Sequence, residues 1–313
     1  MKKLKIIEAK SEIGAGTRGA GMGPDAIRIA SLDFGSSFFK RHESIEVLNE
    51  NKLLLEPVTN EYAKRIKGVY AYCNRLSSEV EAALRADEFP IVLAGDHTSA
   101  IGVAAGIKKT FPDKRIGLIW IDAHSDIHSP YTTPSGNMHG MSIAAILGED
   151  NKEMQINKPD EETIEYWEKI KDLGGIRGKL KYENIVMVSV RDFEWQEQAL
   201  LKKNNVKNIS VEEIRNRGVE RIAVEILTAL DACDLIYVSF DVDSMDAEIS
   251  KGTGTPAPGG LTEKEVSNLI YCLMQSTKIC CLEMVEINPT LDKENRMAEN
   301  AFEILLKATN QFN

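Results

Sequence analysis

Short apolar stretches alternate along the chain with longer stretches of helical period. The apolar stretches predict eight strands, two of them more weakly (45–48 and 206–209): residues 3–8, 45–48, 90–94, 116–121, 184–190, 206–209, 234–240 and 279–285. Most of these stretches are continuously apolar rather than alternating, which is typical of strands covered on both faces. They therefore predict a parallel sheet buried between two layers of helices.

Segments of helical period lie between these strands. They predict helices at residues 24–29, 62–85, 99–109, 141–147, 162–173, 219–231, 262–275 and 294–309. Pro24 follows Gly23 as a first-turn proline does, and residues 262–265 (Thr-Glu-Lys-Glu) have the form of a capping box. Alternation of strands and helices, without an internal repeat or a long linker, predicts an α/β fold in a single domain over residues 1–313.

Polar side chains follow four of the predicted strands at the point where each strand ends. They are Asp96 and His97 after 90–94, Asp122, His124 and Asp126 after 116–121, Asp241 and Asp243 after 234–240, and Glu286 after 279–285. Residues two apart in an extended chain point the same way. Because ligands of open α/β sheets bind beyond the carboxyl ends of the strands, we expect these groups to converge on one site.

The number and chemistry of these groups indicate two divalent metal ions. Four Asp and two His are too many for one ion and include no thiolate, a set that favours Mn²⁺ over Co²⁺, Fe²⁺ or Zn²⁺. Each piece alone has an ordinary explanation, such as a solvated turn at 122–126 or a loop cap at 241–243. Their joint occurrence at three strand ends favours the metal site.

The motifs around these residues resemble those of the ureohydrolase family, which includes arginases and agmatinases. The matching segments are 95–97 (Gly-Asp-His), 122–126 (Asp-Ala-His-Ser-Asp), 135–140 (Ser-Gly-Asn-Met-His-Gly), 239–243 (Ser-Phe-Asp-Val-Asp), 252–256 (Gly-Thr-Gly-Thr-Pro) and 286–289 (Glu-Ile-Asn-Pro). They follow the family's order and spacing from about residue 5 to 309, and segment 135–140 is more similar to arginases than to agmatinases. The resemblance implies an eight-stranded parallel sheet flanked by helices and a centre of two Mn²⁺ ions.

The resemblance also implies a role for each polar group. It assigns one Mn²⁺ to His97, Asp122, Asp126 and Asp241, and the other to His124, Asp122, Asp241 and Asp243. A hydroxide between the two ions would be the nucleophile, because bound water loses a proton near neutral pH. By the same resemblance Glu286 pairs with the substrate guanidinium, His139 shuttles protons to solvent, and Asp126 relays a proton to the leaving amine.

The resemblance places further residues at the amino-acid end of the substrate. Ser135 and Asn137 match residues that contact the α-carboxylate of arginine, and both are neutral donors. Thr255 matches a position near the site, where a purely structural role is equally open.

Two positions at this end depart from the commonest arginase pattern. His128 stands where many arginases have Asn, and Glu194 stands where they have Asp. The imidazole of His128 can still donate to a carboxylate and Glu194 can still accept from the α-ammonium, but both side chains differ in length from those of the common pattern. Glu197 offers a further acceptor for the α-ammonium. His128 also has the alternative explanation of an ordinary loop residue.

These residues predict a manganese-dependent arginase that converts L-arginine to L-ornithine and urea, with Co²⁺ or Fe²⁺ as substitute ions. Another ureohydrolase activity (agmatinase, guanidinobutyrase or formiminoglutamase) is the alternative. Gly14, Gly16 and Gly19 also match a dinucleotide-binding pattern, but the next helix is predicted only from Pro24, so we expect a loop near the mouth of the site instead.

Composition narrows the partners and the setting. The net charge is −10, from 38 Lys+Arg against 48 Asp+Glu, which argues against nucleic acid; two divalent ions would bring it to −10 + 4 = −6. Five cysteines form no CxxC pair, and neither a signal sequence nor an 18-residue apolar run occurs, so we expect a cytoplasmic protein without membrane contact. The family resemblance implies a homo-oligomer, a trimer or a hexamer.

Overall fold

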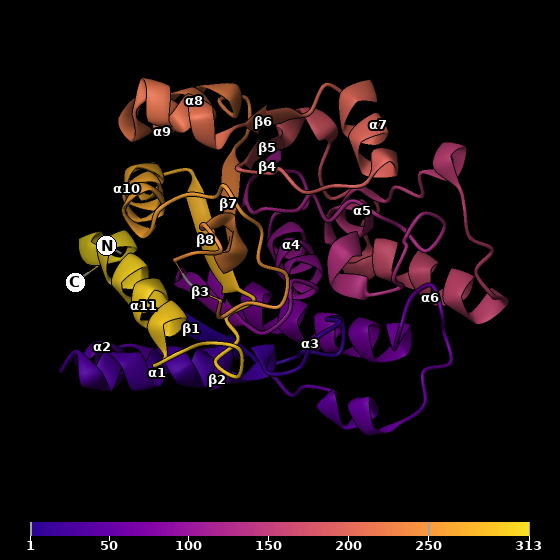
Figure 1. The fold of residues 1–313 in the computed structure, drawn as a ribbon, viewed down its shortest axis with the longest axis horizontal. Coiled ribbons are helices and arrows are strands. Elements are labelled where there is room, and N and C mark those ends of the chain that lie inside the picture. The colour runs from indigo at the N-terminus through magenta and orange to yellow at the C-terminus, as the bar shows by residue number, and fades with distance from the viewer. Residues whose placement is uncertain (1, 250, 313) are drawn as a thin grey trace.

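One parallel sheet runs through the computed structural model, which describes residues 2–249 and 251–312. Its eight strands within these residues are β1 (Leu4–Ala9), β2 (Glu43–Glu46), β3 (Phe89–Ala94), β4 (Ile116–Ile121), β5 (Ile185–Val188), β6 (Lys207–Ile209), β7 (Leu235–Asp241) and β8 (Ile279–Val285). Every neighbouring pair is parallel, in the order β2-β1-β3-β8-β7-β4-β5-β6 (Figure 1). The predicted α/β class and parallel sheet are confirmed. The prediction of one domain stays a prediction, and its residues 1, 250 and 313 lie outside the described residues.

Helices cover the sheet on both faces. The α-helices of the described residues are α1 (Gly23–Asp33), α2 (Phe38–Arg41), α3 (Ile66–Arg85), α4 (Ser99–Thr110), α5 (Ser142–Leu147), α6 (Glu161–Lys171), α7 (Trp195–Lys203), α8 (Val211–Arg217), α9 (Val219–Ala229), α10 (Glu263–Met274) and α11 (Arg296–Ala308). The sequence pattern did not predict α2, α7 and α8. Helices α2 and α8 are too short to show a helical period, and α7 buries little apolar surface. The predicted capping box of Thr262 and Glu265 is present at the start of α10.

Each face of the sheet has its own apolar core. Helices α3, α4, α5 and α6 pack on one face, and α1, α9, α10 and α11 pack on the other (Figure 1). Successive residues of a strand alternate between the two cores, so Trp120 enters the first and Ile119 the second. This double burial explains why the central strands are continuously apolar in the sequence.

The strand order brings the polar strand ends together. Strands β3, β8, β7 and β4 are consecutive at the centre of the sheet, and they are the four strands that end in the predicted site residues. Because all four run parallel, their carboxyl ends share one edge of the sheet. The fold therefore positions the candidate site without any contribution from a second sheet.

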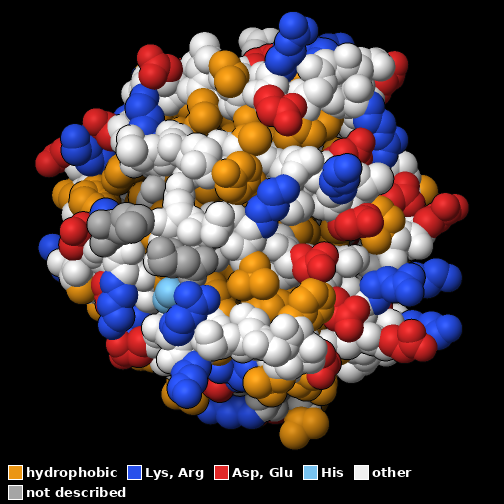
Figure 2. Space-filling view, turned by 90° about the vertical axis from the view of Figure 1, so that its left-hand side faces the viewer, with side chains coloured by type: hydrophobic (Ala, Val, Ile, Leu, Met, Phe, Trp, Pro, Cys, Tyr) orange, Lys and Arg blue, Asp and Glu red, His pale blue; other side chains and the backbone are white. Residues whose placement is uncertain are grey.

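The surface charges, the helix lengths and the cysteines relate to the expectation of a protein with free thiols and no membrane contact. Figure 2 shows acidic and basic side chains interspersed with apolar ones on the face of the molecule that it draws. Among the helices of the described residues, none is both long and apolar enough to span a bilayer. The five cysteines, four of them buried, are free thiols.

A buried lysine gives the fold a pH dependence. Lys179 is 3% exposed, and its ammonium donates to the backbone oxygen of Lys171 at 2.9 Å. Burial lowers the pKa of Lys179 from 10.5 to about 8. The unfolded chain therefore holds more protons than the folded chain between pH 8 and pH 10.5, and stability rises with pH across this window.

We expect Lys179→Met to remove this contribution. The variant should be more stable than the wild type by about 3 kcal/mol at pH 7, because the pKa differs by about 2.5 units and each unit corresponds to 1.36 kcal/mol. The difference should shrink from about pH 8 and vanish above about pH 10.5. Urea unfolding at pH 7, 8, 9 and 10 measures the effect, and Lys181→Met, at an exposed position two residues on, is the control. Equal pH slopes for the wild type and Lys179→Met would contradict the assignment.

Candidate metal centre

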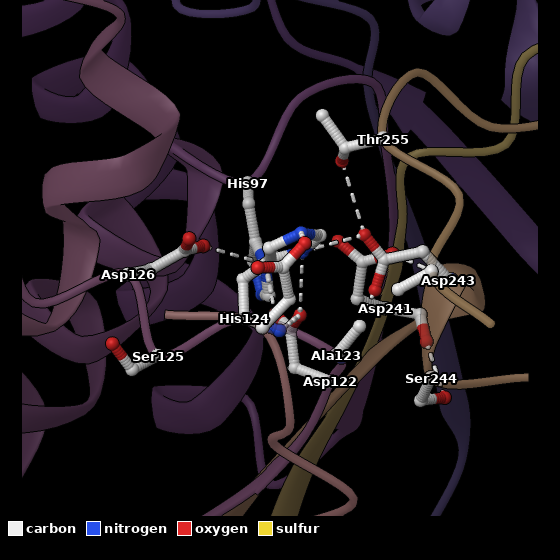
Figure 3. Close-up of polar contacts among 12 residues, drawn as sticks. His97, Asp122, Ala123, His124, Ser125, Asp126, Asp241, Asp243, Ser244 and Thr255 are labelled. Atoms are coloured by element: carbon white, nitrogen blue, oxygen red, sulfur yellow. Dashed lines mark hydrogen bonds and ion pairs between the residues drawn. The ribbon is translucent and has the colours of Figure 1, made fainter. Parts of the chain in front are cut away.

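A fully buried histidine faces three carboxylates at the centre of this edge. Nδ1 of His97 lies 3.1 Å from Oδ2 of Asp122, 3.3 Å from Oδ2 of Asp126 and 3.3 Å from Oδ2 of Asp241 (Figure 3). His97 comes from the end of β3, Asp122 and Asp126 from the end of β4, and Asp241 from the end of β7. The side chains proposed for the first ion are thus brought together.

A second group shares one carboxylate with the first. Nδ1 of His124 lies 3.0 Å from Oδ2 of Asp243 and 3.6 Å from Oδ1 of Asp122. Asp122 therefore turns Oδ1 toward His124 and Oδ2 toward His97. This is the arrangement expected of a carboxylate that bridges two cations.

Backbone hydrogen bonds fix these carboxylates. Oδ1 of Asp122 accepts from the N–H of His124 at 2.6 Å, and Oδ1 of Asp241 accepts from the N–H of Asp243 at 2.9 Å. Oδ1 of Asp243 in turn accepts from the N–H of Ala123 at 3.1 Å, which ties the end of β4 to the end of β7. The remaining oxygens point into the shared space (Figure 3).

The polar atoms at the centre fit metal ions. Nδ1 of His97 and Oδ2 of Asp122 are buried and have no hydrogen-bond partner among the described residues, although they lie 3.1 Å apart. Buried polar atoms are nearly always bonded, so two facing atoms without a partner mark the place of a ligand. Imidazole nitrogen and carboxylate oxygen without thiolate are ligands for divalent ions such as Mn²⁺, Fe²⁺ and Co²⁺.

The electrostatics of the cluster favour cations. Burial, with added repulsion from Asp122, raises the pKa of Asp243 from 3.8 to about 6, and burial and its two neighbouring carboxylates raise the pKa of Asp241 well above the ordinary value. Burial opposes protonation of His97, but contacts with Asp122, Asp126 and Asp241 still hold its pKa well above 6.5. The site retains protons that divalent ions can replace.

Two acidic residues of the site have unusual backbone conformations. Asp126 has φ 45° and Glu286 has φ 64°, both in the left-handed region that residues other than glycine rarely occupy. Such conformations persist where the surroundings enforce them, and they concentrate at functional sites. For Glu286, the N–H bonded to the oxygen of Gly95 at 2.8 Å is one such constraint.

Glu286 joins the metal cluster to His139. Its Oε1 accepts from the N–H of His97 at 3.1 Å and lies 2.8 Å from Nδ1 of His139. Burial opposes protonation of His139, but the charge and hydrogen bond of Glu286, together with the charges of Asp126 and Asp96, raise the pKa of His139 from 6.5 to about 9. His139 lines the pocket above the cluster, whereas Glu286, which the sequence placed at the substrate guanidinium, is 2% exposed and is not among the residues that line the pocket.

The chain matches a known family over nearly its whole length. The family model described as "Arginase family" covers residues 2–309. The chain belongs to the arginase family. It is 32% identical over 310 residues to the arginase of Bacillus subtilis strain 168, covering 97% of this chain and 96% of the relative. The arginase of Staphylococcus aureus strain MSSA476 is 31% identical, with 97% and 96% covered.

Solved arginase structures share the fold. The native structure of the Bacillus caldovelox arginase superposes with a TM-score of 0.84 at 30% identity, and 98% of each chain is covered. The 1.7 Å structure of the Bacillus subtilis arginase gives a TM-score of 0.82 at 32% identity, also with 98% of each chain covered. The family resemblance and the eight-stranded architecture expected from the sequence are both confirmed.

At the outer end of the pocket, the side chain of His128 is in contact with three neighbouring polar side chains. Its Nε2 lies 3.0 Å from Oε2 of Glu194 and 3.4 Å from Oε2 of Glu197, and its Nδ1 lies 3.1 Å from Oγ1 of Thr132. Hydrogen bonding from His128 lowers the pKa of Glu194 to about 2, while burial raises that of Glu197 to about 7. His128 is 6% exposed and lines the pocket, so it is not an ordinary surface-loop residue.

The other residues expected at the substrate also lie on the pocket wall. Ser135, Asn137 and Thr255 all line it, and Oγ1 of Thr255 donates to Oδ2 of Asp243 at 3.1 Å. The ammonium of Lys64 donates to Oδ1 of Asn137 at 3.1 Å. Since Oδ1 is then used, the amide of Asn137 has its N–H groups left as donors.

The glycine-rich segment is a loop at this mouth. The first helix after it is a short 3-10 turn at Ala20–Met22, and α1 begins at Gly23. The backbone oxygen of Gly14 accepts from the N–H of His139, and a Cβ at Gly16 would lie 2.6 Å from Nδ2 of Asn137. The loop therefore closes over the site, and no helix N-terminus comes directly after it as a dinucleotide site requires.

Sequence reasoning missed several residues that support the ligands. Trp120 stacks on His97, with ring centroids 3.9 Å apart and an interplanar angle of 5°. The guanidinium of Arg191 donates to the backbone oxygens of Asp243 and Ala257, at 3.0 and 2.8 Å, and so holds the loop behind the ligands. Trp120 stands two residues before the proposed ligand Asp122, and only this position in the sequence could have indicated its role. Nothing near Arg191 in the sequence indicates that it supports the ligands.

Proposed function

We propose that this protein is an arginase that binds two Mn²⁺ ions and hydrolyses the guanidinium group of L-arginine to L-ornithine and urea. The observation that carries the proposal is that Nδ1 of His97 and Oδ2 of Asp122 face each other without a hydrogen-bond partner, among the side chains of Asp126, Asp241, His124 and Asp243. Membership of the arginase family supports the reaction. Mn²⁺ is the ion that the oxygen-rich ligand set favours, with Co²⁺ or Fe²⁺ as substitutes.

The proposed ligand sets are those predicted from the sequence. His97, Asp122, Asp126 and Asp241 hold one ion, and His124, Asp122, Asp241 and Asp243 hold the other. Two divalent ions held by these residues would lower the pKa of bound water and would so supply a nucleophile near neutral pH. The acidic walls also favour a cationic substrate over a neutral one.

The remaining residues bind the substrate and move protons. The contacts of the Glu286 side chain with His97 and His139 both use Oε1, so Oε2 is the oxygen that we assign to the guanidinium. Asp126, which is also a proposed ligand of the first ion, relays a proton to the departing amine. His139, between Glu286 and the pocket, exchanges that proton with solvent.

The amino-acid end of arginine is assigned to the outer pocket. Ser135 and Asn137 donate to the α-carboxylate, and Glu194 and Glu197 accept from the α-ammonium. His128 already bonds to Glu194 at 3.0 Å, so arginine has to share or displace this contact. The position of the head group is therefore where this chain departs from the commonest family pattern.

A parallel assay tests the proposal. We expect Mn²⁺-loaded protein to release urea faster from arginine than from agmatine or 4-guanidinobutyrate. Of these three, only arginine has both the α-carboxylate and the α-ammonium that the outer pocket would bind. Formiminoglutamate is tested in the same series by release of formamide. Protein without added metal, treated with a chelator, is the control. Faster turnover of agmatine would contradict the assignment of the head-group residues and leave the metal centre standing.

The expected homo-oligomer and cytoplasmic location stay predictions. So does the absence of nucleic-acid and membrane partners.

A further inference from the structure

Three polar side chains lie on a sheet face that is otherwise apolar. Tyr237 and Ser239 of β7 and Glu283 of β8 are fully buried beneath the α3–α4 layer, and Ser239 pairs with Glu283 in the β7–β8 register. Tyr237 and Ser239 both donate to Oε2 of Glu283, Ser239 at 2.8 Å. Oε1 of Glu283 has no hydrogen-bond partner among the described residues. A carboxyl group buried with an unpaired oxygen is unfavourable, so stability does not explain its presence.

This group connects to the metal cluster through His97. Nε2 of His97 lies 2.8 Å from Oγ of Ser239. A serine hydroxyl has one proton, and Ser239 gives it to Glu283, so its oxygen accepts from an N–H at Nε2. The chain of hydrogen bonds therefore places a proton on Nε2 of His97. The opposite nitrogen, Nδ1, is the one that faces Asp122, Asp126 and Asp241.

We propose that Glu283 is a positioning residue that, through Ser239, holds His97 in the tautomer whose Nδ1 binds metal. The hydrogen bond from Tyr237 keeps Glu283 in place, and the stacked ring of Trp120 holds the plane of the imidazole. Metal-binding imidazoles commonly depend on such a partner at the other nitrogen. The inference rests on the proposed metal centre.

Loss of the acceptor at position 283 should change which ring nitrogen of His97 carries the proton. Without this acceptor, the proton of Ser239 can be donated to Nε2 of His97. The imidazole proton then moves to Nδ1, where it blocks the lone pair that the metal needs. The effect should be confined to the ion held by His97, because His124 has no contact with Ser239 or Glu283 among the described hydrogen bonds.

Mn²⁺ binding to the metal-free full-length chain tests the inference, with free Mn²⁺ measured by electron paramagnetic resonance. We expect two sites in the wild type. In Glu283→Leu we expect one site to weaken by about 10- to 100-fold while the other keeps its affinity. Glu283→Gln retains an oxygen that accepts from Ser239 and should stay close to the wild type. Ser239→Ala removes the acceptor for Nε2 directly and should reproduce the one-site loss if Glu283→Leu does not fold.

The control and the outcomes separate this inference from the proposed function. Tyr72→Phe removes another buried hydroxyl, which donates to the backbone oxygen of Ala9 at 2.9 Å, and should leave both sites unchanged. Two wild-type-like sites in both Glu283→Leu and Ser239→Ala, or equal weakening of both sites, would overturn the positioning role alone. A wild-type chain that binds no Mn²⁺ would overturn the metal centre as well.

Discussion

Asp241→Asn is expected to lose both metal ions and almost all activity. Asp241 ends β7; its Oδ2 lies 3.3 Å from Nδ1 of His97 in the first ligand group, and its Oδ1 accepts from the N–H of Asp243 in the second. Asparagine keeps the oxygen that accepts from the N–H of Asp243 at 2.9 Å, so the local turn should persist. It removes the negative charge that both ions would share. Bound Mn²⁺ should fall from two per chain to less than one, as measured by metal analysis after desalting.

The loss of turnover should exceed that of a supporting residue. Removing a group that only orients a metal ligand costs about 10- to 100-fold in affinity or activity, so losing a shared ligand should reduce turnover by more than about 100-fold even in excess Mn²⁺. Asp234→Asn is a matched control, because Asp234 precedes the same strand at its opposite end and bonds to Lys114 and Arg115. An Asp241→Asn protein that holds two Mn²⁺ with unchanged affinity would rule out the bridging role.

The metal ligands could be predicted because they obey local rules. Asp122, His124 and Asp126 are spaced two residues apart directly after an apolar strand, and this spacing marked them as ligands. The segment is not extended as that spacing assumes, because β4 ends at Ile121 and Asp126 has φ 45°. Asp241 and Asp243 repeat the pattern. The buried, parallel character of the strands is also local, since both faces are apolar. These features do not depend on knowing which strands are neighbours.

Contacts set by tertiary structure could not be predicted in this way. The sheet order places β8 between β3 and β7, and only this order brings Glu286 to His97 and His139. The left-handed conformation of Glu286 likewise results from its surroundings, because glutamate has no preference for it. Position in the sequence placed Glu286 at a strand end but gave no partner for it.

The outer pocket shows a second limit. His128 and Glu194 are 66 residues apart, and their contact at 3.0 Å depends on how the loop after β4 meets the start of α7. The sequence showed that both residues differ from the commonest arginase pattern. It did not show that the two differences pair with each other, which makes them one structural feature instead of two.

Glu286→Gln is expected to abolish most catalysis while leaving the metal content unchanged. The amide oxygen can still accept from the N–H of His97, so the end of β3 should keep its geometry. The charge that would pair with the guanidinium is lost. Truncating one partner of a buried charge pair typically costs 2–5 kcal/mol, which corresponds to a fall in kcat/KM for arginine of about 30- to 4,000-fold.

The same substitution should also change His139. Because the charge of Glu286 is the largest of the contributions that raise the pKa of His139 to about 9 against the effect of burial, the pKa should fall in Glu286→Gln, and His139 should then lose its proton at lower pH. Histidine resonances recorded by NMR across pH 5 to 10, in metal-free protein, measure this shift independently of activity. The exposed Glu263→Gln in the first turn of α10 is the control for both experiments. If Glu286→Gln lost metal, or kept wild-type kcat/KM, Glu286 would be a support for the ligands and the guanidinium would have to bind elsewhere.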